Sequence, residues 1–167
     1  MKTFTKSIAG ITAFILIPTL TASGQQMAKE NAEPEKITEG YQFTEGPVWH
    51  DSGYLLFSDI PANTIYKWTP GSEAEVYMKP SGHSNGLTFD REGRLVMAQH
   101  DGAIAKQVGK NSFEIVVDSY EGKRLNSPND LVVKSDGSIY FTDPPYGVSE
   151  EDKRSEEHTS ELQSLLI

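Results

Sequence analysis

The chain has 167 residues, a formal net charge of −9 and no cysteine. The acidic balance argues against a nucleic-acid partner, because binding to phosphates rewards clustered Lys and Arg. The lack of cysteine excludes a disulfide framework and a thiolate metal site. Hydrophobic residues make up 37% of the chain and charged residues 23%, a balance typical of a folded globular domain rather than of a disordered chain.

The N-terminus has the features of a secretory signal peptide over residues 1–24. Lys2 and Lys6 precede an apolar run at 8–20, and small residues follow at 21–24. The run is shorter than the ~20 residues that span a bilayer, so a membrane anchor is the weaker interpretation. We expect a polar linker at 25–35, a periplasmic or secreted protein, and no stable membrane insertion after cleavage.

A motif returns three times in the same phase along the chain. Its copies are Glu45-Gly46-Pro47-Val48-Trp49, Asn85-Gly86-Leu87-Thr88-Phe89 and Asn129-Asp130-Leu131-Val132-Val133. A glycine turn and a strand-like run follow each copy, and the copies start 40 and 44 positions apart. A period near 40 built from short strands is typical of propeller blades, so we predict an all-β propeller fold.

The turn residues between the apolar runs divide the chain into two complete blades and half of a third. For the first blade we expect strands at 46–50, 54–58, 64–68 and 74–78. For the second we expect strands at 87–90, 94–99, 103–108 and 113–117, and for the third at 131–134 and 138–142. Trp49, Phe89 and Val133 share one phase and are expected in the core between blades. Asp59 and Asp143 occupy matching strand ends, where we expect them to hydrogen-bond blade corners.

The repeat stops before the C-terminus. The run from Arg154 to Ser164 resembles the in-frame translation of a common sequencing-library adapter, and a natural charged tail or short helix is the alternative. We therefore assign 36–153 to a partial propeller and 154–167 to a non-native tail. Propellers close with typically four to eight blades, so two and a half blades leave strand edges and sheet faces open. We expect the chain to be the front part of a longer protein.

Equivalent positions in successive blades point toward one axis, so Glu45, Asn85 and Asn129 are expected to converge. Asp130 adds a second carboxylate beside them. Calcium and similar hard cations take six to eight such oxygen ligands, and a bound cation polarises a carbonyl group. The alternative is that Asn and Asp residues before a strand only cap a turn. For Asn85, this alternative is about as strong as the metal-site interpretation. His100 is a weaker candidate for the channel wall, with a solvated loop histidine as its alternative.

The three motifs, together with Ser127-Pro128-Asn129-Asp130-Leu131 and Tyr140-Phe141-Thr142-Asp143-Pro144, resemble the SMP-30/gluconolactonase family. The resemblance extends from about Ile37 to about Glu150, roughly the first half of a member. It implies a six-bladed propeller with one divalent metal, usually calcium, in its channel. It also implies a carboxylic-ester hydrolase whose substrate is a small sugar lactone, with relatives that cleave other esters or organophosphates.

By this resemblance, Glu45 corresponds to the first metal ligand. Asn129 corresponds to a channel asparagine that contacts the metal in some members and the substrate in others. The family's later Asn ligand, and the Asp that acts as ligand and general base, have no counterpart before Glu150. The catalytic base is therefore expected beyond this chain, and the chain by itself is expected to be inactive.

Two other functions compete with this one. The first is a non-catalytic propeller that binds calcium or a sugar acid as a scaffold. The second is a serine esterase, because Gly82-His83-Ser84-Asn85-Gly86 fits the G-x-S-x-G pattern. That motif needs a helix after the serine, whereas the residues that follow Ser84 predict a strand, a hairpin and another strand. The histidines have no H-x-H or H-E-x-x-H spacing, which argues against a zinc cluster.

Overall fold

The computed structural model describes residues 33–148 and the backbone of 164–166. All of its strands belong to one compact unit that begins at Lys36. The predicted signal peptide, the linker up to residue 32 and residues 154–163 of the predicted tail lie outside the described residues. In the described part of the chain, no helix has the length and apolar character needed to cross a membrane.

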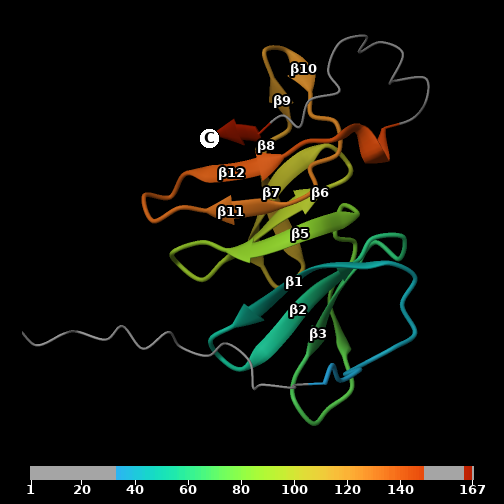
Figure 1. Cartoon of the computed structure of the whole chain (residues 1–167). Coiled ribbons are helices and arrows are strands. Elements are labelled where there is room, and N and C mark those ends of the chain that lie inside the picture. The colour runs from blue at the N-terminus through green and yellow to red at the C-terminus, as the bar shows by residue number, and fades with distance from the viewer. Residues whose placement is uncertain (1–32, 149–163, 167) are drawn as a thin grey trace, which may run out of the picture. The chain divides into compact units, whose positions relative to one another are not determined.

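Antiparallel sheets follow one another along the chain, each with its strands in sequence order (Figure 1). The first contains β1 (Thr44–His50), β2 (Tyr54–Asp59), β3 (Thr64–Trp68) and β4 (Glu75–Met78). The second contains β5 (Ser84–Phe89), β6 (Leu95–Gln99), β7 (Ala103–Gly109) and β8 (Ser112–Val117). The third contains β11 (Leu131–Val133), β12 (Ile139–Thr142) and β13 (Ser164–Leu166). These sheets confirm the predicted all-β architecture of truncated propeller blades.

The first strand of each complete blade begins earlier than predicted. β1 begins at Thr44 rather than at 46, and β5 begins at Ser84 rather than at 87. Both strands contain a register shift, between Glu45 and Val48 in β1 and between Ser84 and Leu87 in β5. A bulge of this kind lets the strand continue through a glycine that, in sequence, looks like a strand end.

Four further elements were not predicted from the sequence. A short hairpin of β9 (Ser119–Tyr120) and β10 (Lys123–Arg124) leads to the third sheet, and a 3-10 turn, η1 (Pro145–Gly147), follows β12. β13 falls within the segment 154–167 that we assigned to a non-native tail, and it pairs with β12 as the third strand of the last sheet. Two- and three-residue strands carry too few side chains to show a period in the sequence.

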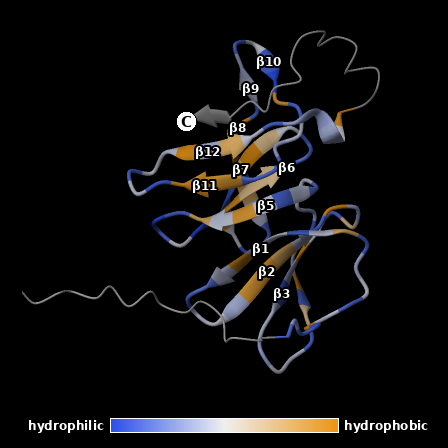
Figure 2. Cartoon of the chain, in the orientation of Figure 1, coloured by the Kyte–Doolittle hydropathy of each residue, from blue (hydrophilic) through white to orange (hydrophobic). Residues whose placement is uncertain are grey.

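Apolar side chains fill the spaces between successive sheets, and Figure 2 shows hydrophobic residues concentrated along the strands. One cluster joins the first and second sheets through Leu56, Ile65, Met78, Leu87, Leu95, Met97 and Ala105. A second cluster joins the second and third sheets through Val96, Ala98, Ile104, Leu125, Leu131 and Phe141. β6 alternates between the two faces of its sheet, so Leu95 and Met97 join the first cluster while Val96 and Ala98 join the second.

Trp49 does not lie in the core between blades as the sequence predicted. Phe89 and Val133, at the equivalent positions, do pack against the two interblade clusters. Trp49 instead is 52% exposed. Side chains at this repeat position face the preceding blade. Trp49 is exposed because, among the described residues, no sheet precedes the first.

Candidate functional site

The inner strands of the three blades lie side by side, with β5 between β1 and β11 (Figure 1). Their first residues line one small pocket of about 200 Å³. Glu45 comes from β1, Asn85 from β5, and Asn129 and Asp130 from the turn that enters β11. The structure therefore brings these four predicted residues together.

Two glycines allow the inner strands to approach this closely. Gly46 has a φ of +56°, and a Cβ at this position would lie 2.1 Å from the backbone oxygen of Asn85. The N–H of Gly86 donates to the backbone oxygen of Asn129 at 2.7 Å, and a Cβ on Gly86 would collide with that oxygen. A side chain at either position would push the blades apart at the pocket.

Asp130 stands at the position that glycine occupies in the first two repeats. Its carboxylate oxygen Oδ1 accepts the N–H of Leu131 at 2.8 Å, which is the turn-capping contact that sequence reasoning offered as the alternative role. The same oxygen lies 2.8 Å from where a Cβ of Gly86 would be. Asp130 therefore caps its turn and also lines the pocket.

Asn85 is 5% exposed, and both its backbone and its side chain have polar partners. Its backbone oxygen accepts the hydroxyl of Ser58 at 2.9 Å. Its side-chain Nδ2 lies 3.0 Å from Nε2 of His100. Sequence reasoning missed Ser58, because a lone serine inside a strand has no pattern that distinguishes it from any other.

His100 is half-buried in the turn after β6, beside Asn85, and it does not itself line the pocket. Burial lowers the pKa of His100, and the charge of His83 lowers it further. The negative charges of Asp101 and Glu45 oppose this shift in the pKa without reversing it. The imidazole of His100 is consequently neutral near pH 7.

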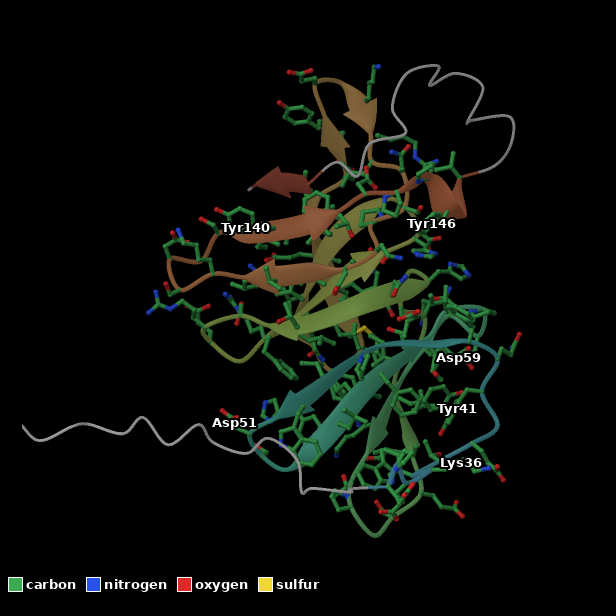
Figure 3. All side chains as sticks on the ribbon, viewed as in Figure 1. Lys36, Tyr41, Asp51, Asp59, Tyr140 and Tyr146 are labelled. Carbon is green, nitrogen blue, oxygen red and sulfur yellow. The ribbon has the colours of Figure 1, made fainter. Side chains whose placement is uncertain are left out.

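Hydrogen bonds between two loops fix the turn that carries Asn129. The N–H of Asn126 donates to Oδ2 of Asp143 at 2.8 Å, and the hydroxyl of Ser127 donates to the backbone oxygen of Pro144. The N–H of Gly147 donates to Oγ of the same serine at 2.8 Å. This bonding of Asp143 is the corner role expected of it, and Tyr146 projects from η1 into solvent (Figure 3).

Asp59 has the same role at the corner of the first blade. Its two carboxylate oxygens accept the N–H groups of Gln42 and Phe43, both at 3.1 Å. The ring of Tyr41 packs edge-on against Phe57, with ring centroids 4.9 Å apart. These contacts fix the segment that leads into Glu45.

Ser84 does not have the geometry of a catalytic serine. It is fully buried, and its hydroxyl lies 2.9 Å from that of Ser58. β5 runs from Ser84 into a hairpin with β6, whereas a nucleophile elbow requires a strand followed by a helix. The serine-esterase hypothesis therefore has no support at this position.

The donor atoms at the pocket suit a hard divalent cation. Two carboxylates and two amide groups supply the oxygen ligands that calcium takes, and water or other protein groups would complete its six to eight positions. In the described residues, no three His, Cys, Asp or Glu side chains gather as a metal cluster. A cation at this pocket would therefore need oxygen ligands other than carboxylates, and the pocket offers amide groups.

Comparisons of the sequence and of the structure with known proteins point to the same family. Residues 43–164 match the model of the SMP-30/Gluconolactonase/LRE-like region. A gluconolactonase from Zymomonas mobilis subsp. mobilis is 41% identical over 135 residues, which cover 71% of this chain and 38% of that protein.

Solved structures agree with this match. A structural-genomics protein assigned to the gluconolactonases superposes with a TM-score of 0.65 at 33% identity, covering 79% of this chain and 47% of its own. The gluconolactonase XC5397 from Xanthomonas campestris gives a TM-score of 0.62 at 36% identity, covering 66% of this chain and 38% of its own. The chain thus spans less than half the length of these relatives. Its repeats, its pocket and these matches together show that the chain belongs to the SMP-30/gluconolactonase family.

Proposed function

We propose that these blades are the first part of a divalent-metal-dependent hydrolase of sugar lactones. The proposal is supported most directly by the pocket at which Glu45, Asn85, Asn129 and Asp130 meet from three successive blades. Membership of the gluconolactonase family supports a lactone as the substrate class. Calcium is the cation that the mixed carboxylate and amide donors fit best.

Each residue of the pocket has a distinct task in this proposal. Glu45 and Asn129 hold the cation, and Asn85 and Asp130 complete the wall against which the lactone lies. When bound, the cation polarises the lactone carbonyl and offsets the negative charge that develops on its oxygen. By the family resemblance, the general base is an aspartate that follows these blades in a complete member.

Calcium binding to the chain tests the metal site without any need for turnover. We expect isothermal titration calorimetry to detect one site, and Glu45→Gln to weaken it by roughly tenfold or more, because the substitution removes one charged ligand. Glu73→Gln removes an exposed carboxylate in the turn before β4 and should leave the affinity unchanged. Equal binding by both variants would remove Glu45 from the site.

Lactone hydrolysis by a protein that carries the complete set of blades separates the enzyme from a binding scaffold. In that protein, Glu45→Gln should abolish the hydrolysis of gluconolactone while its melting temperature stays within a few degrees. Removal of metal with a chelator should have the same effect, and added calcium should restore activity. Hydrolysis that is undetectable in the unmodified protein would favour a scaffold that binds calcium or a sugar acid.

The cellular location is a separate proposal that rests on residues 1–24. We propose export to the periplasm or the medium, with removal of this segment. N-terminal sequencing of the protein from fractionated cells tests it. A mature chain beginning after the small residues 21–24 supports export, whereas an intact N-terminus in the cytoplasmic fraction contradicts it.

A further inference from the structure

We propose that His100 is a positioning residue that turns the side-chain amide of Asn85 so that its oxygen, not its nitrogen, faces the pocket. This inference deepens the proposed function, because it adds Asn85 to the oxygen donors available to a divalent cation. His100 itself touches neither the cation nor the lactone in this account, and it acts only through Asn85.

The contact between the two side chains joins two nitrogen atoms. Nδ2 of Asn85 lies 3.0 Å from Nε2 of His100. An amide nitrogen can only donate, so Nε2 must accept and the imidazole proton must sit on Nδ1. In the reverse arrangement, Nε2–H would donate to Oδ1 of Asn85 and the amide N–H groups would face the pocket. Within the described residues, Oδ1 of Asn85 accepts no hydrogen bond and remains available to a ligand.

The surroundings of the pocket make this orientation informative. Glu45 and Asp130 contribute carboxylates to the same lining. Beside two carboxylates alone, an amide N–H would be a better neighbour than an amide oxygen, because like partial charges repel. An oxygen presented there becomes favourable when a cation shares the pocket. The orientation of Asn85 therefore fits a cation site better than a purely structural turn.

The position of His100 is itself fixed from two sides. Its backbone N–H donates to the backbone oxygen of His83 at 3.1 Å. Gly147 packs so closely that a Cβ on it would lie 3.4 Å from Cβ of His100. Gly147 is in turn bonded to Ser127, in the loop that leads to Asn129. His100 thus contacts Asn85 directly and lies next to Gly147, which is bonded to the loop that carries Asn129.

Nuclear magnetic resonance of the ¹⁵N-labelled full chain near neutral pH tests the orientation directly. We expect a scalar coupling between Nδ2 of Asn85 and Nε2 of His100 across the hydrogen bond, with Nε2 unprotonated. A proton on Nε2, or the absence of the coupling, would overturn the proposal. This signature would not appear if the two side chains merely packed against each other.

Calcium titration of two variants tests the consequence for the site. His100→Gln can accept the same amide N–H through its own oxygen and should keep the calcium affinity of the unmodified chain. His100→Leu cannot, and should lower the affinity by about tenfold, as loss of a residue that supports a ligand typically does. His50→Leu, at the far end of β1, is the matched control and should leave the affinity unchanged.

These results separate this inference from the proposed function. Calcium affinity that is unchanged in His100→Leu would overturn the positioning role and leave the metal site standing. A second possible result is that the unmodified chain shows the nitrogen–nitrogen coupling but binds no calcium. That result would overturn the proposed metal site and leave the orientation of Asn85 established.

Discussion

At the scale of single residues, the pocket requires two glycines as well as the polar side chains that line it. Gly46 and Gly86 are the points where β1 meets β5 and where β5 meets the turn into β11. The sequence showed both glycines at one repeat position but gave no reason for them. Their role depends on distances between blades, and no local pattern encodes those distances.

Gly46→Ala should therefore be far more costly than an ordinary glycine substitution. Its Cβ would meet a backbone oxygen in a neighbouring blade, so the strands must separate, and we expect a loss of about 2–4 kcal/mol in the free energy of unfolding. Gly53→Ala is the matched control: its φ is +86°, but nothing lies within 4 Å of the added carbon. That variant should lose about 1 kcal/mol, which reflects backbone strain alone. Urea unfolding measures both, and equal losses would show that the close approach is not needed.

The candidate site was predictable in part for the same reason. The shared repeat position of Glu45, Asn85 and Asn129 identified residues that the structure places at one pocket. Ser58 and the contact of His100 with Asn85 were not predictable, since each depends on which side chains face each other across two strands. A repeat predicts which positions are equivalent, but not which neighbours touch them.

At the scale of elements, the strands followed from turn residues and apolar runs. β3 has the predicted bounds, since turn residues precede it and its own residues favour strands. The early starts of β1 and β5 were missed because a bulge carries a strand through Gly46 and Gly86. The hairpin of β9 and β10 was missed because two-residue strands have no detectable period.

One segment without regular secondary structure is also held by specific hydrogen bonds. The segment 36–43 is bonded to the end of β2 through the carboxylate of Asp59 (Figure 3). Asp59→Ala removes both hydrogen bonds, and such charge-assisted bonds contribute about 1.5–3 kcal/mol each. We expect the amides of Gln42 and Phe43 to exchange with solvent more than tenfold faster, as measured by hydrogen–deuterium exchange.

Asp51→Ala, in the exposed turn between β1 and β2, is the control for this prediction and should leave both exchange rates unchanged. Unchanged exchange in Asp59→Ala would mean that the packing of Tyr41 against Phe57, rather than the carboxylate, holds the segment in place.

At the scale of the whole molecule, apolar side chains are exposed on one face of the first sheet and one face of the third. Trp49 and Val76 lie on one face of the first sheet and are 52% and 58% exposed. Val132 and Tyr140 pair on one face of the third sheet and are 60% and 38% exposed. Phe89 and Val96, the equivalents of Trp49 and Tyr140 in the second sheet, pack in the interblade clusters. The number of blades in the sequence therefore predicted apolar exposure at the two outer sheets.

Exposed apolar faces of this kind promote self-association. We expect the chain to form larger species as its concentration rises, measured by size-exclusion chromatography with light scattering. The double variant Val132→Lys with Tyr140→Lys should shift the distribution toward the monomer without lowering the melting temperature. Val108→Lys replaces an exposed valine at the end of β7 and serves as the control. An unchanged distribution in the double variant would show that this face is not responsible.

We propose that three successive blades bring Glu45, Asn85 and Asn129 to one cation site. A crystal structure of the chain grown with calcium would locate the ion. We expect a single ion at the pocket, about 2.3–2.6 Å from a carboxylate oxygen of Glu45 and from the amide oxygens of both asparagines. An ion bound elsewhere, or an amide nitrogen of Asn85 turned toward the pocket, would show that the three residues do not form this site.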